Sequence, residues 1–529
     1  MAKSEQREHT GKHALLVASG ILLTRLVGLV RTRVFSYYFG LRSDPADAFN
    51  AAFRIPNFLQ TLFGEGVLSA SFIPVYSRLL AEKDEEEAGR VAGAVAAVLA
   101  LTVSAIVLAG VLATPYIIDL IVGGLHGAKR ELTIRLVRIL FPGAGLLVMS
   151  AWCLGILNSH RRFFLSYTAP VAWNLVMIGS LVGFGRRVTD LSSLAVVFAW
   201  ASVAGSALQF AVQLPAVRNL VRQLRVRWDP DSAHVREVVR NFIPVFFSRG
   251  VVQISAYVDI WLAGWLPTGA ITGLTNAQLL YTLPVSLFGM SVSAAELPAM
   301  SSALGDTAEV AEYLRNRLNR GLRQIAFFIV PSAMAFLALG GVITGALFQT
   351  GAFTRGDSLY VWGILAGSAV GLLASTLGRL YSSTYYALRD TRTPLRYAIV
   401  RVTLTTGLGY LCALPLPVWL GIEPRWGVAG LTASAGVSGW VEFALLRRTL
   451  NARLGRTGLP AALTAKLWLS AGIGAAAAWG VKLTIGNLHP ILAAGAILAP
   501  YGLIYFAVAY LLRVEECADA LRRFRRIVR

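Results

Sequence analysis

Apolar runs of about 18–25 residues recur along the whole chain, and they restrict it to one kind of fold. Each run is long enough to cross a hydrocarbon core of roughly 30 Å as a helix. Of the 529 residues, 56% are hydrophobic and only 15% are charged, whereas soluble proteins average about 25% charged residues. A membrane β-barrel would instead show short alternating segments. The sequence therefore predicts an all-α polytopic membrane protein.

The runs predict about 14 transmembrane helices. The expected spans are His13–Phe39, Ala46–Leu80, Val91–Ile118, Leu132–Leu157, Phe163–Phe184, Leu191–Leu214, Asn241–Leu266, Thr272–Met300, Ile325–Phe348, Leu359–Leu388, Tyr397–Leu420, Val428–Leu446, Ala461–Ile485 and Ile491–Leu512. An even number of spans places both termini on the same side of the membrane.

The formal net charge of +21 has a topological explanation. If the N-terminus is cytoplasmic, the cytoplasmic segments carry about 31 Lys or Arg residues and the outer segments about 8. Cytoplasmic loops of membrane proteins are enriched in these residues, so the asymmetry predicts that both termini are cytoplasmic. It also accounts for the basic composition without a nucleic-acid partner.

The sequence contains an internal repeat. TRLV around Arg25 corresponds to SRGV around Arg249, and LFG occurs at both 62–64 and 287–289. Both matches have an offset of about 224–225 residues, an interval that holds six predicted spans. Because six is even, the two copies point the same way, which is typical of parallel repeats in transporters that work by alternating access.

This repeat predicts two parallel six-helix lobes followed by a C-terminal helix pair. The expected divisions are 1–225 for the N-terminal lobe, 226–456 for the C-terminal lobe, and 457–529 for the helix pair with its basic tail.

Charged residues inside the predicted spans carry the functional signal. A charge near the centre of a bilayer costs at least about 2.5–3.5 kcal/mol on insertion scales, so each one needs a partner or a polar cavity. Basic residues predominate and are predicted to bind substrate: Arg25, Arg31, Arg54, Arg249 and Arg379. Acidic residues are predicted to serve in gating or as charge partners: Glu65, Asp259 and Glu296. Because guanidinium groups hold phosphate oxygens with two parallel hydrogen bonds, the excess of arginine favours an anionic, phosphate-bearing ligand.

The sequence offers no arrangement that indicates catalysis. It has no His and carboxylate spacing typical of metal sites, and no glycine-rich phosphate loop of the ATPase type. Its three cysteines are too scattered for a metal site or a disulfide framework. We therefore expect a transporter that needs no cofactor or metal, rather than an enzyme.

Several motifs resemble the MurJ (MviN) family of lipid II flippases, within the superfamily of multidrug, oligosaccharidyl-lipid and polysaccharide exporters. The matching segments are Thr24, Arg25, Gly28 and Arg31; Asp47-Ala48-Phe49; Pro56-Asn57; FGEG at 63–66; ILNSHRRFFLSYTAPVAWN at 156–174; QISAYVD at 253–259; LPVSLFGMSVSAAELPAMS at 283–301; LFQTGAFTRGD at 347–357; and YALRDTRTPLR at 386–396. The resemblance covers roughly residues 14–450.

The resemblance implies that the protein moves a polyprenyl-diphosphate glycolipid, lipid II, from the inner to the outer leaflet of the bacterial inner membrane. It implies that Arg25, Arg31 and Arg379 lie at diphosphate-binding positions, and that Asp47 and Glu65 lie at acidic ones. Asn57 lies in the matched motif. Membrane lipids and cell-wall synthesis proteins are further expected partners. Gln60 and Leu279 depart from the pattern, because the family usually has arginine at both positions.

Three alternatives remain open at this stage. Gln60 and Leu279 favour an exporter of another polyprenyl-diphosphate-linked polysaccharide. A membrane-embedded glycosyl or phosphoryl transferase would need paired acidic residues near an interface, and the acids here are scattered. A non-transporting scaffold of cell-wall assembly would not depend on the charges inside the spans.

Overall fold

A computed structural model describes the backbone of residues 2–221, 224, 227–229, 232–302, 307–486 and 488–528. Side chains are described throughout these ranges except at 2–19, 21, 65–66, 245, 247–256, 307, 521 and 523–528. In this part of the chain every regular secondary-structure element is a helix. The only β-type pairing there is an isolated bridge between Thr350 and Phe353. The predicted all-α class is therefore confirmed.

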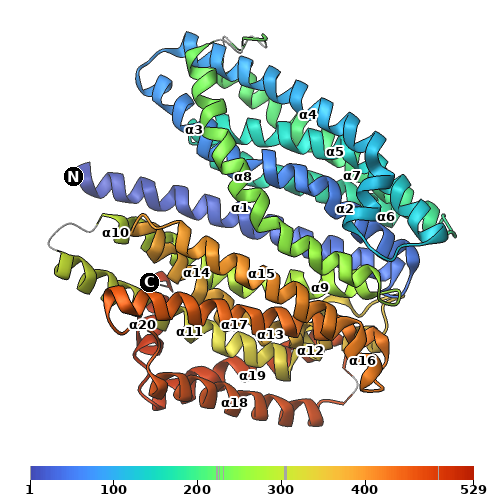
Figure 1. Ribbon diagram of the computed structural model, residues 1–529, viewed down its shortest axis with the longest axis vertical. Helices are drawn as coiled ribbons and strands as arrows, with labels where there is room; N and C mark the ends of the chain where they lie inside the picture. The colour runs from blue at the N-terminus through green and yellow to red at the C-terminus, as the bar shows by residue number, and fades with distance from the viewer. Residues whose placement is uncertain are drawn as a thin grey trace. The chain divides into compact units, whose positions relative to one another are not determined.

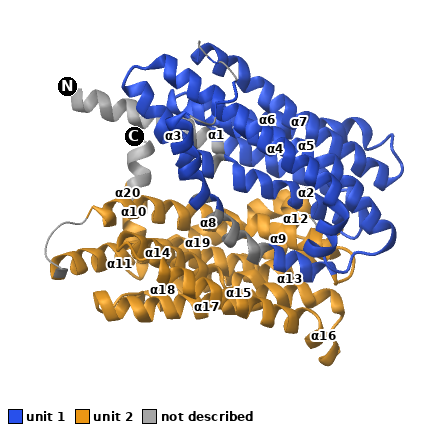
Figure 2. Ribbon diagram, turned by 45° about the horizontal axis from the view of Figure 1, so that its top comes forward, with its two compact units in different colours: residues 1–264, 350–353 blue, residues 265–349, 354–529 orange. Residues whose placement is uncertain are grey.

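The chain forms two compact units (Figure 2), one made of residues 1–264 and 350–353 and the other of residues 265–349 and 354–529. The helices of the first unit, labelled in Figure 1, are α1 (Ala2–Phe39), α2 (Asp44–Phe63), α3 (Glu65–Ala81), α4 (Glu85–Ile121), α5 (Gly127–Ser159), α6 (Phe163–Phe184), α7 (Leu191–Leu220) and α8 (Ala233–Gly264). The fifth predicted span, Phe163–Phe184, begins and ends at the same residues as α6.

The second unit contains more and shorter elements, because several of its helices are broken. They are α9 (Ala270–Pro284), the π-helix η1 (Val285–Met290), α10 (Ser291–Ser301), α11 (Thr307–Ala338), α12 (Gly340–Phe348), α13 (Arg355–Ala369), α14 (Leu372–Ala387), α15 (Arg392–Ala413), α16 (Pro415–Trp419), the 3₁₀ helix η2 (Pro424–Trp426), α17 (Gly427–Leu454), α18 (Ala461–Thr484), α19 (Pro490–Leu511) and α20 (Glu515–Val528).

Eleven helical segments are long and apolar enough to cross a membrane. Counting the pair α13 and α14, which meet at a bend of 42°, as one further span gives twelve. The count covers only residues that the structure describes, and α1 and α8 are not part of it. The outer faces of these helices are also apolar: on α4, Leu101, Leu108 and Leu112 are all more than half exposed. A helix with so much exposed leucine is suited to lipid, and the chain is a multi-pass membrane protein.

Two of the spans break at the LFG motif of the repeat. In the first unit α2 ends at Phe63 and α3 begins at Glu65, with Gly64 in an extended conformation between them. A Cβ on Gly64 would lie 2.0 Å from the backbone oxygen of Gln60, so only glycine fits this break. In the second unit the corresponding LFG lies inside η1, where the helix widens to a π-helix after Pro284. π-helical turns of this kind are frequent at functional sites.

A buried polar network holds α5 against α7 in the first unit. The Ser150 hydroxyl donates to the Gln213 side-chain oxygen at 2.9 Å and accepts from the Gln209 amide at 2.9 Å. Glycines allow close approach nearby, since a Cβ on Gly205 would lie 2.6 Å from the Trp173 ring. Small residues and interhelical hydrogen bonds are the usual means of helix association in lipid. They fix α7 against α5 and α6, and α6 carries part of the candidate site.

The C-terminal pair α18 and α19 is anchored to α11. The Tyr501 and Tyr505 hydroxyls donate to the backbone oxygens of Pro331 and Phe327, both at 2.6 Å. An apolar cluster formed by Leu339, Ala475, Ala478 and Ile497 with their neighbours fills the space between these helices.

Candidate functional site

Arg31 on α1 lies inside the first unit and is held by aromatic rings. Its guanidinium carbon is 5.6 Å from the centre of the Phe53 ring and 5.2 Å from that of Trp173. One guanidinium nitrogen is also 3.8 Å from the sulfur of Met177. Phe53 and Trp173 are themselves stacked at 5.8 Å and nearly parallel, at 7°. These cation–π contacts stabilise the charge of Arg31 inside the protein.

No carboxylate of the described residues pairs with Arg31. Aromatic faces compensate a cation less completely than an ion pair does, and they leave the N–H edges of the guanidinium available. An arginine in this state can bind the oxygens of a phosphate through its edge while its faces stay stacked. Arg31 is therefore prepared for an anionic ligand.

Arg54, one residue after Phe53 on α2, interacts with α8 instead. Its backbone oxygen accepts a hydrogen bond from the Tyr257 hydroxyl at 3.3 Å, and its guanidinium lies within electrostatic range of the Asp259 carboxylate. Tyr257 also packs edge-on against Phe58, with ring centres 5.4 Å apart. Two consecutive residues of α2 thus connect that helix to α1 and to α8. The structure brings the predicted residues Arg54 and Asp259 together.

Asp47, in the first turn of α2, is a buried partner of a lysine. Its carboxylate accepts from Lys129 at the start of α5 at 2.9 Å, and the Asp47 side chain is only 1% exposed. Lys129 also lies 3.4 Å from Asp44, whose side chain is 58% exposed. Asp47 is therefore paired with a cation that sequence reasoning had not connected to it.

Replacing Asp47 by asparagine is expected to destabilise the protein by about 2 kcal/mol, because Lys129 loses a buried charge-assisted hydrogen bond. Thermal unfolding of the detergent-purified protein measures the effect as a melting temperature several degrees below that of the wild type. Asp44→Asn removes the exposed partner of the same lysine and should change stability by less than about 0.5 kcal/mol. Equal melting temperatures for the two variants would contradict a structural role specific to Asp47.

Of the remaining predicted residues of the first unit, the structure describes the side chains of Arg25 and Asn57. Arg25 is exposed on α1, and Asn57 is half-buried on α2. Gln60, one of the two departures from the family pattern, is also half-buried on α2. The side chains of Glu65 and Arg249 lie outside the described residues.

The predicted residues of the second unit are separate from one another in their contacts. Glu296 on α10 accepts from the Arg317 side chain on α11 at 2.7 Å, so it is an ion-pair partner there. Arg379 is exposed on α14, and Leu279, the second departure, is half-buried on α9.

The YALRDTRTPLR motif forms the turn between α14 and α15. Asp390 accepts hydrogen bonds from the backbone and the hydroxyl of Thr393, at 3.0 and 2.7 Å, and forms an ion pair with Arg453 at 2.8 Å. These bonds, chiefly those from Thr393, lower the pKa of Asp390 to about 2. Asp390, a residue of the matched motif, therefore stabilises this turn.

The comparison with known families decides the assignment. A family described as "Lipid II flippase MurJ" matches residues 35–501. The chain belongs to the lipid II flippase MurJ family. Flippases are transporters that move a lipid between leaflets, so this is a transporter family and not a family of enzymes.

Curated relatives support the MurJ assignment. The lipid II flippase MurJ of Burkholderia cenocepacia is 30% identical over 447 residues, covering 83% of this chain and 84% of the relative. The probable lipid II flippase MurJ of Bdellovibrio bacteriovorus is 31% identical over 454 residues, covering 84% of this chain and 83% of the relative.

Solved structures share the fold. A structure titled "Lipid II flippase MurJ, inward closed conformation" has a TM-score of 0.76 at 24% identity and covers 94% of this chain and 99% of its own. An inward-facing multidrug transporter of the MATE family and MOP superfamily has a TM-score of 0.64 at 18% identity. The match covers 83% of this chain and 98% of the transporter chain. The predicted resemblance to the MurJ family is confirmed, and the two solved structures share the fold of this chain.

Sequence reasoning missed the residues that surround the charged positions of this MurJ family member. Phe53, Trp173 and Met177 contact Arg31, while Lys129 and Arg317 pair with Asp47 and Glu296. Trp173 ends the motif SYTAPVAWN together with Asn174, so the motif match was the one available signal for it.

Proposed function

We propose that the chain translocates lipid II, the polyprenyl-diphosphate-linked peptidoglycan precursor, from the inner to the outer leaflet of the bacterial inner membrane, for cell-wall biogenesis. Family membership and the names of the relatives support this substrate. Arg31 is the observation that carries the proposal. It is a cation within a membrane helix, stacked on two aromatic rings and without a carboxylate partner among the described residues.

The chemistry of the substrate matches this arrangement. A diphosphate carries several anionic oxygens, each of which accepts hydrogen bonds from a guanidinium edge. In the proposed mechanism Arg31 and Arg54 hold the diphosphate, with contributions from Arg25 and Arg249 of the same unit. We also propose that Arg379, in the second unit, binds substrate. The Asp259 carboxylate, which lies within electrostatic range, compensates part of the Arg54 charge while the site is empty.

We infer that the other predicted polar residues serve as gating or charge partners. Asp47 pairs with Lys129 and Glu296 with Arg317. Breaking and remaking such pairs during transport would let the protein alternate between inward-open and outward-open states. Asn57 and Glu65 are assigned the same role on the strength of their place in the matched motifs.

We propose fourteen spans, which are the twelve described above together with α1 and α8. Both termini are then cytoplasmic, in agreement with the distribution of Lys and Arg. The helix breaks at Gly64 and at η1 occur at the two copies of LFG, which supports the two parallel lobes, 1–225 and 226–456, followed by the pair in 457–529. Cell-wall synthesis proteins remain proposed partners.

Rescue of a bacterium depleted of its own lipid II flippase tests the function. Expression of the wild-type chain is expected to restore growth and rod or coccal shape. Lysis of the depleted cells despite normal amounts of the protein in the membrane would overturn the proposal.

A further inference from the structure

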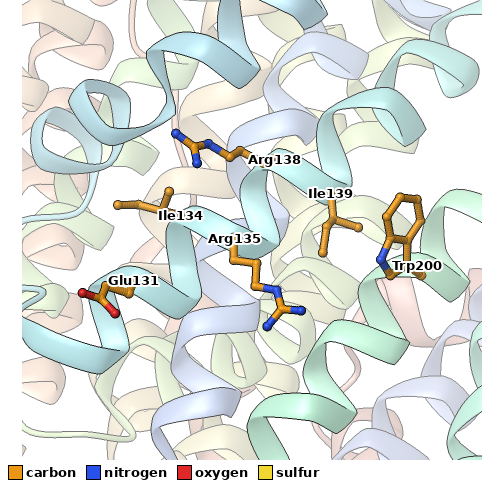
Figure 3. A pocket seen from close by; sticks show the side chains of 6 residues that line it. All are labelled: Glu131, Ile134, Arg135, Arg138, Ile139 and Trp200. Atoms are coloured by element: carbon orange, nitrogen blue, oxygen red, sulfur yellow. The ribbon is translucent and has the colours of Figure 1, made fainter.

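A charged cavity lies between α5 and α7 in the first unit. Its volume is about 570 Å³, and it is lined by Glu131, Ile134, Arg135, Arg138, Ile139 and Trp200 (Figure 3). None of these residues is among those predicted or proposed to bind the diphosphate. The cavity is open on one side, and its side chains leave α5 and α7 without enclosing a closed chamber, as Figure 3 shows.

Two arginines line this cavity. Arg135 and Arg138 are 8 and 11 residues from the start of α5 at Gly127, which places them about 12 and 16 Å along the helix axis. Both side chains are exposed, and neither forms an ion pair with a described carboxylate. Exposed arginines on the apolar surface of a membrane-spanning helix are costly unless they are compensated. An anionic partner outside the protein would compensate both.

The positive-inside rule does not account for these arginines. In the proposed orientation the start of α5 and the start of α7 face the outer side of the membrane, where Lys and Arg are depleted. Arg135 and Arg138 oppose that bias. The rule that explains the basic cytoplasmic loops therefore does not explain Arg135 and Arg138.

The walls of the cavity are apolar and fit a lipid chain. Ile134 and Ile139 flank the arginines on α5, and Trp200 on α7 is 57% exposed beside them (Figure 3). Tryptophan is enriched where the membrane meets its headgroups, because the ring has an apolar body and a polar N–H. A ligand with a charged head and an apolar chain can contact both the arginines and the apolar walls of this cavity. A free inorganic anion can contact only the arginines.

Glu131 restricts the charge of the head group. Its carboxylate lies at the end of the row opposite Trp200, beyond Ile134 (Figure 3). A carboxylate repels a multiply charged ligand but accepts hydrogen bonds from hydroxyl groups. Two arginines and one carboxylate leave a local charge of +1, which suits a head group with one phosphate charge and free hydroxyls.

We propose that this cavity binds an anionic phospholipid with a hydroxyl-bearing head group, of the phosphatidylglycerol class. Arg135 and Arg138 lie one helical turn apart on α5. Their guanidinium groups point in different directions (Figure 3), and we expect both long side chains to turn toward a bound phosphate. Glu131 accepts from the glycerol hydroxyls. Ile134, Ile139 and Trp200 contact the first part of an acyl chain. The site is independent of the transported substrate.

Lipid retention by the full-length protein tests this site. Purified protein is exchanged into nanodiscs of phosphatidylcholine with a small fraction of phosphatidylglycerol, then extracted into detergent, and bound lipid is counted by native mass spectrometry. The double variant R135Q/R138Q is expected to retain phosphatidylglycerol at least about tenfold less than the wild type, because two charge-assisted hydrogen bonds are lost.

The control removes the same charge from the same side of the first unit. Arg186 and Arg187 are exposed in the loop between α6 and α7, so R186Q/R187Q should retain lipid like the wild type. Unchanged retention in R135Q/R138Q, equal loss in the control, equal retention of phosphatidylcholine, or displacement by millimolar inorganic phosphate would each overturn the proposal.

The result does not depend on transport, because retention is measured without a substrate. If R135Q/R138Q yields no folded protein, R138Q alone is expected to lower retention about threefold. Wild-type retention in folded R138Q would also contradict the proposal.

Discussion

Replacing Arg31 by alanine is expected to abolish the rescue of flippase-depleted cells while the amount of protein in the membrane stays unchanged. The substitution removes the guanidinium that lies over Phe53 and Trp173 and the N–H edges that would bind phosphate. A hydrogen bond to a charged group contributes about 2 kcal/mol, so affinity for the diphosphate should fall roughly thirtyfold or more. Colony growth together with immunoblotting of membranes measures both quantities.

Two further variants separate charge from geometry. Arg31→Lys keeps the positive charge but loses the planar group that stacks on both rings, and partial rescue is expected. Arg187→Ala removes an exposed loop arginine and should leave rescue intact. Normal growth of the Arg31→Ala strain at wild-type protein levels would remove Arg31 from the site.

Removing Asp259 alone is expected to reduce the amount of folded protein strongly. Asp259→Ala removes the carboxylate that lies within electrostatic range of Arg54, and a buried charge without compensation is destabilising. Removing both partners, in Arg54→Ala/Asp259→Ala, should restore most of the folded protein because no unpaired charge remains. The monodisperse fraction and melting temperature in detergent measure this recovery.

Transport should not recover with the fold in that double variant, because Arg54 is proposed to bind substrate. Folded protein that fails to rescue growth is therefore the expected outcome. If Asp259→Ala alone folds normally and supports growth, the pairing of Arg54 with Asp259 has no part in the mechanism.

The general nature of the protein could be predicted from the sequence because membrane helices are determined locally. An apolar run of about 20 residues is visible without knowledge of any contact, and α6 begins and ends at the predicted residues. The break between α2 and α3 was also visible, because Gly64 lies beside Glu65 in an otherwise apolar run. Pro56 in the same run favours a second break, which the structure does not have, because α2 continues through it to Phe63.

The partners of the charged residues could not be predicted, because they depend on contacts between distant segments. Trp173 lies 142 residues from Arg31, and Lys129 lies 82 residues from Asp47. Trp173 lies in a matched motif, but nothing in its local sequence indicates that its ring contacts Arg31. The cavity beside the arginines of α5 could not be predicted for a related reason. In the sequence these arginines lie in one predicted span, and only the packing of α5 against α7 brings Trp200 beside them.

The accessibility of lipid II at the outer leaflet tests the central claim most directly. Flippase-depleted cells are supplied with the wild-type chain or with Arg31→Ala, and a membrane-impermeant enzyme that cleaves lipid II is added outside the membrane. The cleaved fraction is expected to rise from background to the level of undepleted cells with the wild-type chain, and to stay at background with Arg31→Ala. A background level of cleavage with the wild-type chain present in normal amounts would contradict the account.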